Sequence, residues 1–123
     1  MEERRKFVRL DTRLPVSYQV MRGPASKGSL SSDISGGGVC LFLSEPLKPG
    51  TILSVEVTLP EQARRIAFTG EVIWCEQYEV IGKTQRERSV EAGVKFIQIE
   101  PPDQQAIMRH VILSLQPQPP ASS

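Results

Sequence analysis

The chain has 123 residues, a length that suits one domain with one hydrophobic core. Hydrophobic residues make up 39% of it and charged residues 24%, so it has ordinary globular composition and needs no disulfide or metal to fold. A formal net charge of +1 provides no global field for a nucleic-acid polymer or an anionic membrane. These values exclude a strongly basic nucleic-acid-coating protein and favour a small globular module.

The sequence contains no recognisable targeting or membrane segment. The N-terminus, MEERRKFVRLD, lacks a signal-peptide-like apolar stretch, and no apolar run approaches the length of a bilayer span. Cys40 and Cys75 each lie in an apolar run, which is typical of free buried thiols and leaves a disulfide between neighbouring strands open. We therefore expect a cytoplasmic protein that does not insert into membranes.

Alternating apolar and polar residues predict strands along most of the chain. These segments are LPVSYQVM (14–21), ILSVEVTLP (52–60), IAFTGEVIWC (66–75) and VEAGVKFIQI (90–99), and GVCLFLS (38–44) is typical of a buried strand. The residues expected to face the core are Leu14, Val16, Tyr18, Val20, Leu53, Val55, Val57, Leu59, Phe68, Val72, Trp74, Val90, Ala92, Val94 and Phe96.

The connecting segments are rich in turn-forming and polar residues. RGPASKGS (22–29) and EPLKPG (45–50) are predicted turns. SLSSDIS (29–35), which lies between the predicted strands 14–21 and 38–44, is expected to be extended. Gly70 indicates a bulge or a close backbone approach. EQYEVIGKTQRERS (76–89) is predicted to be a long, charged hairpin loop.

The hydrophobic period changes near residue 101. PPDQQAIMRHVILSL opens with prolines and Asp103 and repeats Ile107, Val111 and Leu115 at helical spacing, which predicts an amphipathic helix at about 101–115. Short strands with one terminal helix predict an all-β-dominated fold, a closed or nearly closed antiparallel β-barrel. We expect a flexible N-terminal arm over 1–13, the barrel and helix over 14–115, and a disordered, Pro-rich tail over 116–123.

The residue set offers little for catalysis or metal binding. His110 is the single histidine, and together with two dispersed cysteines it matches no four-ligand zinc spacing. A lone helical histidine is more often a surface or edge residue than a ligand. IGKT (81–84) ends like a phosphate-binding loop, but Gln77 stands where that motif requires glycine. We predict a protein that is not an enzyme, with no catalytic residue, no metal and no cofactor.

Two segments carry a binding signal. In RRKFVR (4–9), Arg5 and Arg9 are four residues apart, and guanidinium groups suit phosphate oxygens and the O6 and N7 atoms of guanine. In DISGGG (33–38), Asp33 can accept hydrogen bonds from guanine, and Ser35 offers a hydroxyl. Gly38 would let a ligand approach the backbone. Alone, each segment also fits an ordinary interpretation: a solvated basic terminus, and a turn with local hydrogen bonds and positive-φ glycines.

Together, the RxxxR motif (Arg5, Arg9) and the following DxSxxG motif (Asp33, Ser35, Gly38) resemble the PilZ domain family. The resemblance extends over nearly the whole chain, including GEVIWCE and AGVKFIQIEPPDQQAI before the helix. It implies a six-stranded antiparallel β-barrel that binds the bacterial second messenger cyclic di-GMP. By this resemblance, Arg5 and Arg9 grip guanines and phosphates, Asp33 and Ser35 bind one guanine, and Gly38 keeps the surface open. Arg4 occupies the position that influences whether one or two ligand molecules bind.

The resemblance implies a sensor whose Arg-rich arm becomes ordered on ligand binding and whose output lies in an unidentified effector protein, in motility or exopolysaccharide regulation. One alternative is an interaction module on the same fold that does not bind the nucleotide. Another is a general nucleic-acid binder, which the net charge of +1 and the few aromatic residues disfavour. We expect no nucleic-acid polymer as a partner, and a monomer or weak homodimer.

Overall fold

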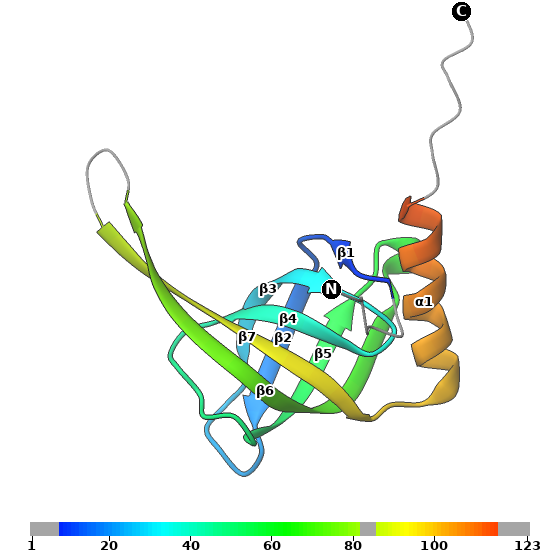
Figure 1. Cartoon of the computed structure of the whole chain (residues 1–123). Helices are drawn as coiled ribbons and strands as arrows, with labels where there is room; N and C mark the ends of the chain where they lie inside the picture. Colours follow the sequence, from blue (N-terminus) through cyan, green and yellow to red (C-terminus); the bar gives the residue numbers. More distant parts are fainter. Residues whose placement is uncertain (1–7, 82–85, 116–123) are drawn as a thin grey trace, which may run out of the picture.

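The computed structural model describes residues 8–81 and 86–115 and consists mainly of β-strands (Figure 1). The predicted tail, 116–123, lies outside the described residues. The elements are β1 (Leu10–Asp11), β2 (Pro15–Val20), β3 (Lys27–Ile34), β4 (Gly38–Leu43), β5 (Ile52–Thr58), the short 3₁₀ helix η1 (Glu61–Ala63), β6 (Arg65–Ile81), β7 (Arg86–Gln98) and α1 (Pro101–Leu115).

The strands form one antiparallel sheet in the order β1-β3-β2-β5-β6-β7-β4, and pairing of β3 with β4 closes it. The closed part, β2 to β7, is the predicted six-stranded barrel. β1 is an additional strand within the segment that the sequence assigned to the arm. Leu10 pairs with Ile34 and Pro15 pairs with Leu30, so β1 and β2 follow one another along the same edge of β3.

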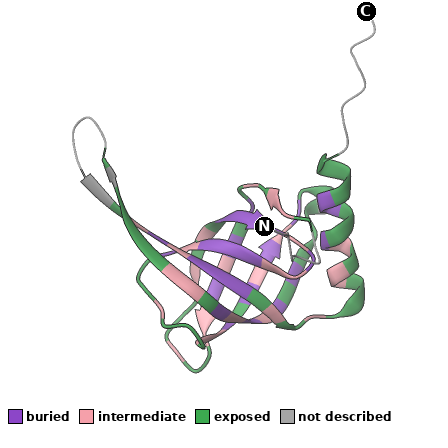
Figure 2. Ribbon diagram, in the orientation of Figure 1, coloured by how far each residue is buried: buried purple, intermediate pink, exposed green. Residues whose placement is uncertain are grey.

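Most of the alternating apolar positions that the sequence predicted belong to the hydrophobic core, and Figure 2 shows buried residues recurring along the strands of the barrel. β5 is the clearest case, since Leu53 and Val57 are 0% exposed while Ser54 between them is exposed. The turn before β3 is shorter than predicted, because β3 already begins at Lys27. Its first half pairs with β2 and its second half with β4.

Helix α1 has the predicted bounds and buries Ile107 and Val111 in the core, whereas Leu115 is exposed. The expectation of a surface or edge position for His110 was wrong, since its side chain is only 5% exposed. His110 Nδ1 lies 2.9 Å from both carboxylate oxygens of Glu61, which joins α1 to η1. Neither helix of the described part is long and apolar enough to cross a membrane.

Strand β6 departs from the prediction beyond Val72. A register shift lies between Val72, which pairs with Val94, and Trp74, which pairs with Gly93. A β-bulge of this kind interrupts the alternation of faces. Trp74 therefore leaves the predicted core-facing position, and Cys75 packs against the core instead.

The predicted hairpin loop over 76–89 is also wrong in its extent. Continuous pairing of β6 with β7 runs outward as far as Ile81 and Arg86. Apolar and aromatic residues such as Tyr78 favour the extended conformation, and the pairing sets Glu79 opposite Arg88. The two strands consequently project from the barrel as a ribbon (Figure 1).

Candidate functional site

A cavity of about 310 Å³ opens beside the turn that joins β3 to β4. The cavity lies on the outer face of the barrel. Val39 and Leu41 on β4 face the core, so Gly38 and Cys40, which alternate with them, face outward and line the cavity. Four residues singled out in the sequence line it together: Arg9, Asp33, Ser35 and Gly38. Arg4 and Arg5 lie outside the described residues.

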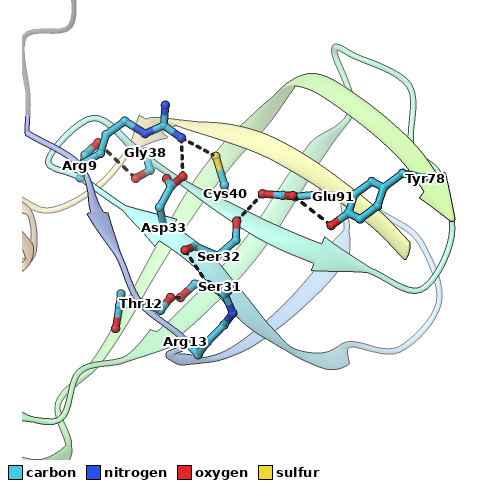
Figure 3. A network of polar contacts seen from close by, with 11 residues as sticks. Arg9, Thr12, Arg13, Ser31, Ser32, Asp33, Gly38, Cys40, Tyr78 and Glu91 are labelled. Atoms are coloured by element: carbon cyan, nitrogen blue, oxygen red, sulfur yellow. Dashed lines mark hydrogen bonds and ion pairs between the residues drawn. The ribbon is translucent and has the colours of Figure 1, made fainter. Parts of the chain in front are cut away.

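The charged centre of the cavity is an ion pair between Arg9 and Asp33 (Figure 3). Ile34 points into the core, so the preceding Asp33 on β3 points outward, next to a register shift between Ser31 and Asp33. Asp33 is only 8% exposed, and Arg9 Nη2 donates to its carboxylate. This hydrogen bond raises the pKa of Arg9, against the opposing effect of burial. The structure thus joins one residue of each sequence motif.

Cys40 lies beside this pair on the outer face of β4. Arg9 Nη2 is 3.7 Å from its Sγ atom. Burial and the neighbouring Asp33 raise the pKa of the Cys40 thiol to about 12, so this thiol stays protonated in mildly alkaline solution, where an ordinary cysteine ionises. Cys40 and Cys75 are both free and face opposite sides of the sheet, so the disulfide left open by the sequence is not formed.

The turn from Ser35 to Gly38 forms one wall of the cavity. Ser35 N–H donates to the Gly38 carbonyl at 2.9 Å, and the Ser35 hydroxyl accepts from Gly37 N–H at 3.1 Å. These are the local hydrogen bonds expected of such a turn. Gly38 also has a packing role, because a Cβ atom there would lie 2.3 Å from the Val94 carbonyl oxygen. The glycine is therefore required by the contact between β4 and β7, whether or not a ligand binds.

The two sequence motifs do not include Trp74 and Gly93, which form another part of the cavity wall. Both line the cavity, and a Cβ atom on Gly93 would lie 2.2 Å from Trp74 Nε1. The indole thus rests directly on the glycine backbone. The bulge in β6 turns Trp74 outward, and alternation alone could not reveal it. The glycine between two apolar residues of β7 was the available signal, since such a position often marks close approach.

The sequence model of the PilZ domain matches residues 3–113. The chain belongs to the PilZ domain family. PilZ domains are receptor and adaptor modules for cyclic di-GMP rather than enzymes. A search of curated proteins found no match.

Solved structures with this fold include three PilZ proteins. The Bacillus subtilis inhibitor of motility MotI/DgrA is 26% identical, with a TM-score of 0.74 over 92% of this chain and 52% of that one. The PilZ domain of YcgR from Escherichia coli, solved with c-di-GMP, is 18% identical, with a TM-score of 0.73 over 92% of each chain. The K. pneumonia MrkH–c-di-GMP complex is 20% identical, with a TM-score of 0.68 over 93% of this chain and 52% of that one. This PilZ chain thus spans about half the length of MotI and MrkH.

A polar network continues from this cavity along the outer face of the barrel (Figure 3). The hydroxyl group of Ser32, next to Asp33, donates a hydrogen bond to the carboxylate of Glu91 on β7. Tyr78 on β6 donates to the other carboxylate oxygen of Glu91 at 3.4 Å. Arg13 donates to the Ser32 carbonyl at 2.9 Å. The network therefore links the strand that carries Asp33 to the base of the β6–β7 ribbon.

Proposed function

We propose that this chain is a receptor for cyclic di-GMP that signals to a partner protein. The observation that carries the proposal is the joint lining of one outward-facing cavity by Arg9, Asp33, Ser35 and Gly38. These residues come from two separate sequence segments, and Arg9 and Asp33 are 24 positions apart in the chain. Their chemistry, a guanidinium fork next to a carboxylate and a hydroxyl, suits a guanine nucleotide.

Each motif residue has a distinct proposed role. Arg9 and Arg5 donate to phosphate oxygens and to guanine O6 and N7, while Asp33 accepts from guanine N1–H and the exocyclic amine. Ser35 adds a hydrogen bond, and Gly38 leaves the backbone accessible. Arg4 supplies a further phosphate or stacking contact.

The ion pair between Arg9 and Asp33 supports this assignment. A guanidinium has five N–H donors, so the contact with Asp33 leaves Arg9 further donors for a phosphate or a base. The carboxylate likewise retains acceptor capacity beyond the bond it receives. The pair therefore holds both groups in the cavity, next to one another, before a ligand arrives.

Trp74 extends the proposed site beyond the two motifs. Its indole lines the cavity and rests on Gly93, which pairs with Cys40, the partner of Asp33 on the neighbouring strand. A flat aromatic surface in the same cavity as a guanine-binding carboxylate suits base stacking, which is worth about 1–3 kcal/mol per base. We assign Trp74 the role of stacking a guanine whose edge is bound by Asp33 and Ser35.

The signalling step follows from charge. The segment RRKFVR places arginines and a lysine close together, and their mutual repulsion falls when a ligand with two phosphates binds between them and the barrel. Ordering of the part of this segment that precedes Arg9 alters a surface that an effector protein can bind. The similarity to the inhibitor of motility MotI/DgrA makes motility the process to examine first.

Calorimetric titration with cyclic di-GMP tests the proposal. We expect saturable binding to the unaltered chain, and a loss of about 1.5–3 kcal/mol, or more than tenfold in affinity, in Arg9→Ala and Asp33→Ala. Arg65→Ala is the matched control, because Arg65 is exposed at the start of β6 and does not line the cavity. Its affinity should stay within about twofold of the unaltered chain, the range of a surface substitution.

A flat titration of the unaltered chain would contradict the proposal and favour an interaction module that does not bind the nucleotide. Equal affinities of the unaltered chain, Arg9→Ala and Asp33→Ala would reject the site while leaving binding intact. A parallel titration with a single-stranded oligonucleotide should give no heat. Saturable oligonucleotide binding would favour the general nucleic-acid binder instead.

A further inference from the structure

The turn of the proposed site is fixed by hydrogen bonds from three directions. The Gly38 carbonyl accepts from Ser35 N–H at 2.9 Å, within the turn itself. The Gly37 carbonyl accepts from Phe96 N–H on β7 at 3.1 Å. The Gly36 carbonyl accepts from the side-chain amide of Gln104 on α1 at 2.7 Å. Two of these bonds belong to the barrel, and the third comes from the C-terminal helix.

The bond from Gln104 is the tightest of the three and the only one of them made by a side chain. Gly36 is buried, so its carbonyl has little access to water as a replacement partner. Gln104 lies in the first turns of α1, a helix held in place by the buried side chains of Ile107 and Val111. A helix anchored in the core by these side chains therefore supplies a donor to the turn.

We infer that Gln104 is a positioning residue of the ligand site, acting through the Gly36 carbonyl on the turn that carries Ser35 and Gly38. Gln104 and Gly36 do not line the cavity, whereas Ser35, Gly37 and Gly38 do. The contribution of Gln104 is thus to the placement of the wall and not to ligand contact. The inference rests on the proposed function, since the site it serves is the proposed cyclic di-GMP site.

Coupling between a hydrogen bond and ligand affinity is reciprocal. If the bond from Gln104 favours the binding conformation of the turn, ligand binding must stabilise that bond by the same factor. Helix α1 thereby becomes an element whose attachment to the barrel responds to site occupancy. Its first turns should be better protected from hydrogen exchange when the ligand is bound.

Substitutions at Gln104 and at its neighbour Gln105 form matched pairs. Gln104→Glu keeps the shape of the side chain but replaces the donor by a carboxylate, and Gln104→Met removes the donor without adding charge. Gln104→Lys retains an N–H donor. Gln105 is exposed and makes none of these contacts in the described part of the chain, so Gln105→Glu and Gln105→Lys control for charge.

The first measurement is calorimetric affinity for cyclic di-GMP, with thermal unfolding followed to confirm that each variant is folded. Loss of one hydrogen bond predicts an affinity about tenfold lower in Gln104→Glu and Gln104→Met. Gln104→Lys and both Gln105 variants should stay within about threefold of the unaltered chain. Unaltered affinity in both Gln104→Glu and Gln104→Met, or an equal loss in Gln104→Lys, would overturn the inference.

The second measurement needs no ligand and separates this inference from the proposed function. In the free protein, Gln104→Glu and Gln104→Met should shift the amide resonances of Gly36 and Gly37 and speed hydrogen exchange of Gly37, with no such change in the Gln105 variants. If the unaltered chain does not bind cyclic di-GMP, the proposed function fails. Altered turn exchange would then still support the positioning role, and unaltered turn exchange would overturn it.

Discussion

Strand β7 belongs to two regions that differ in the number of strands around them. From Val90 to Lys95 it lies between β4 and β6, and the proposed ligand site is built on this part. From Arg86 to Ser89 it pairs with β6 alone, and the two strands form the projecting ribbon. A two-stranded ribbon has little stability of its own. The closed sheet, and not the length of the strands, therefore holds the site walls in place.

Glu91 stands at the boundary between these regions. Its carboxylate accepts hydrogen bonds from Ser32 on the site side and from Tyr78 on the ribbon side. It also lies opposite Glu76 across the β6–β7 pair, and like charges in such a pair are unfavourable. The two hydrogen bonds compensate part of that repulsion where the ribbon leaves the barrel.

Hydrogen exchange should show the largest difference between the two regions. We expect the Val94 amide to exchange on the order of a thousandfold more slowly than the Arg88 amide, because core strands open only with global unfolding and weakly supported segments open locally. Residue-resolved exchange of the unaltered protein checks this. Similar protection at both positions would mean that the ribbon is stabilised as strongly as the barrel.

The alkylation rate of Cys40, beside the proposed site, should show the next largest effect. The pKa of Cys40 is raised to about 12 by burial and by Asp33, whereas an unperturbed cysteine has a pKa of about 8.5. At pH 8 in a Cys75→Ser variant, iodoacetamide should therefore modify Cys40 at least about a hundredfold more slowly in the folded than in the urea-unfolded chain. Equal rates in the two states would contradict a closed environment around Cys40.

The same shift has a definite sign for stability. The folded state holds the Cys40 proton more tightly than the unfolded state, so this thiol adds stability below pH 9 and loses it as the pH rises towards 12. The free energy of unfolding should fall less steeply over this interval in Cys40→Ala than in the unaltered chain. Parallel curves would show that the thiol does not contribute.

Gly38→Ala should destabilise the barrel by about 1–3 kcal/mol, since the added methyl group has no room beside the Val94 carbonyl oxygen. Gly28→Ala is the matched control, because a Cβ atom on Gly28 would meet nothing within 4 Å. Gly28 also lies in β3, so both substitutions are made in strands. Urea denaturation of the two variants gives the comparison, and equal stabilities would disprove the close contact at Gly38.

The smallest effect is expected at the ribbon. Tyr78→Phe removes one 3.4 Å hydrogen bond from an exposed side chain, and we expect a change below about 0.5 kcal/mol in the free energy of unfolding. The affinity for cyclic di-GMP should not change measurably. A loss of affinity as large as that expected for Arg9→Ala would show that the ribbon and the site are energetically connected.

The sequence predicted the barrel well because alternation reports directly which face of a strand is buried. The pattern in β5 held along its full length, and the period change gave the bounds of α1, although Leu115 at the end of the predicted apolar repeat is exposed. It failed where a single bulge reset the alternation, as at Trp74, and where polar residues obscured strand pairing, as over 76–81. The burial of His110 could not be foreseen, because its partner Glu61 lies 49 residues away.

The site was predictable only to the extent that its residues lie in short motifs. Arg9 and Asp33 were singled out and do meet, but the contribution of Gly93 depends on its register with Trp74. The hydrogen bond from Gln104 to Gly36 spans 68 residues and follows no local pattern. Such contacts are set by the closure of the sheet and the packing of the helix, which no single segment encodes.

The outward turn of Trp74 has a practical consequence, because it is the only tryptophan in the chain. Fluorescence excited at the red edge of the protein absorbance therefore comes from Trp74 alone and reports on the wall of the proposed ligand cavity. Quenching or a wavelength shift would follow the arrival of a purine without any attached dye. The bulge between Val72 and Trp74 therefore places an intrinsic fluorophore where the ligand is proposed to bind.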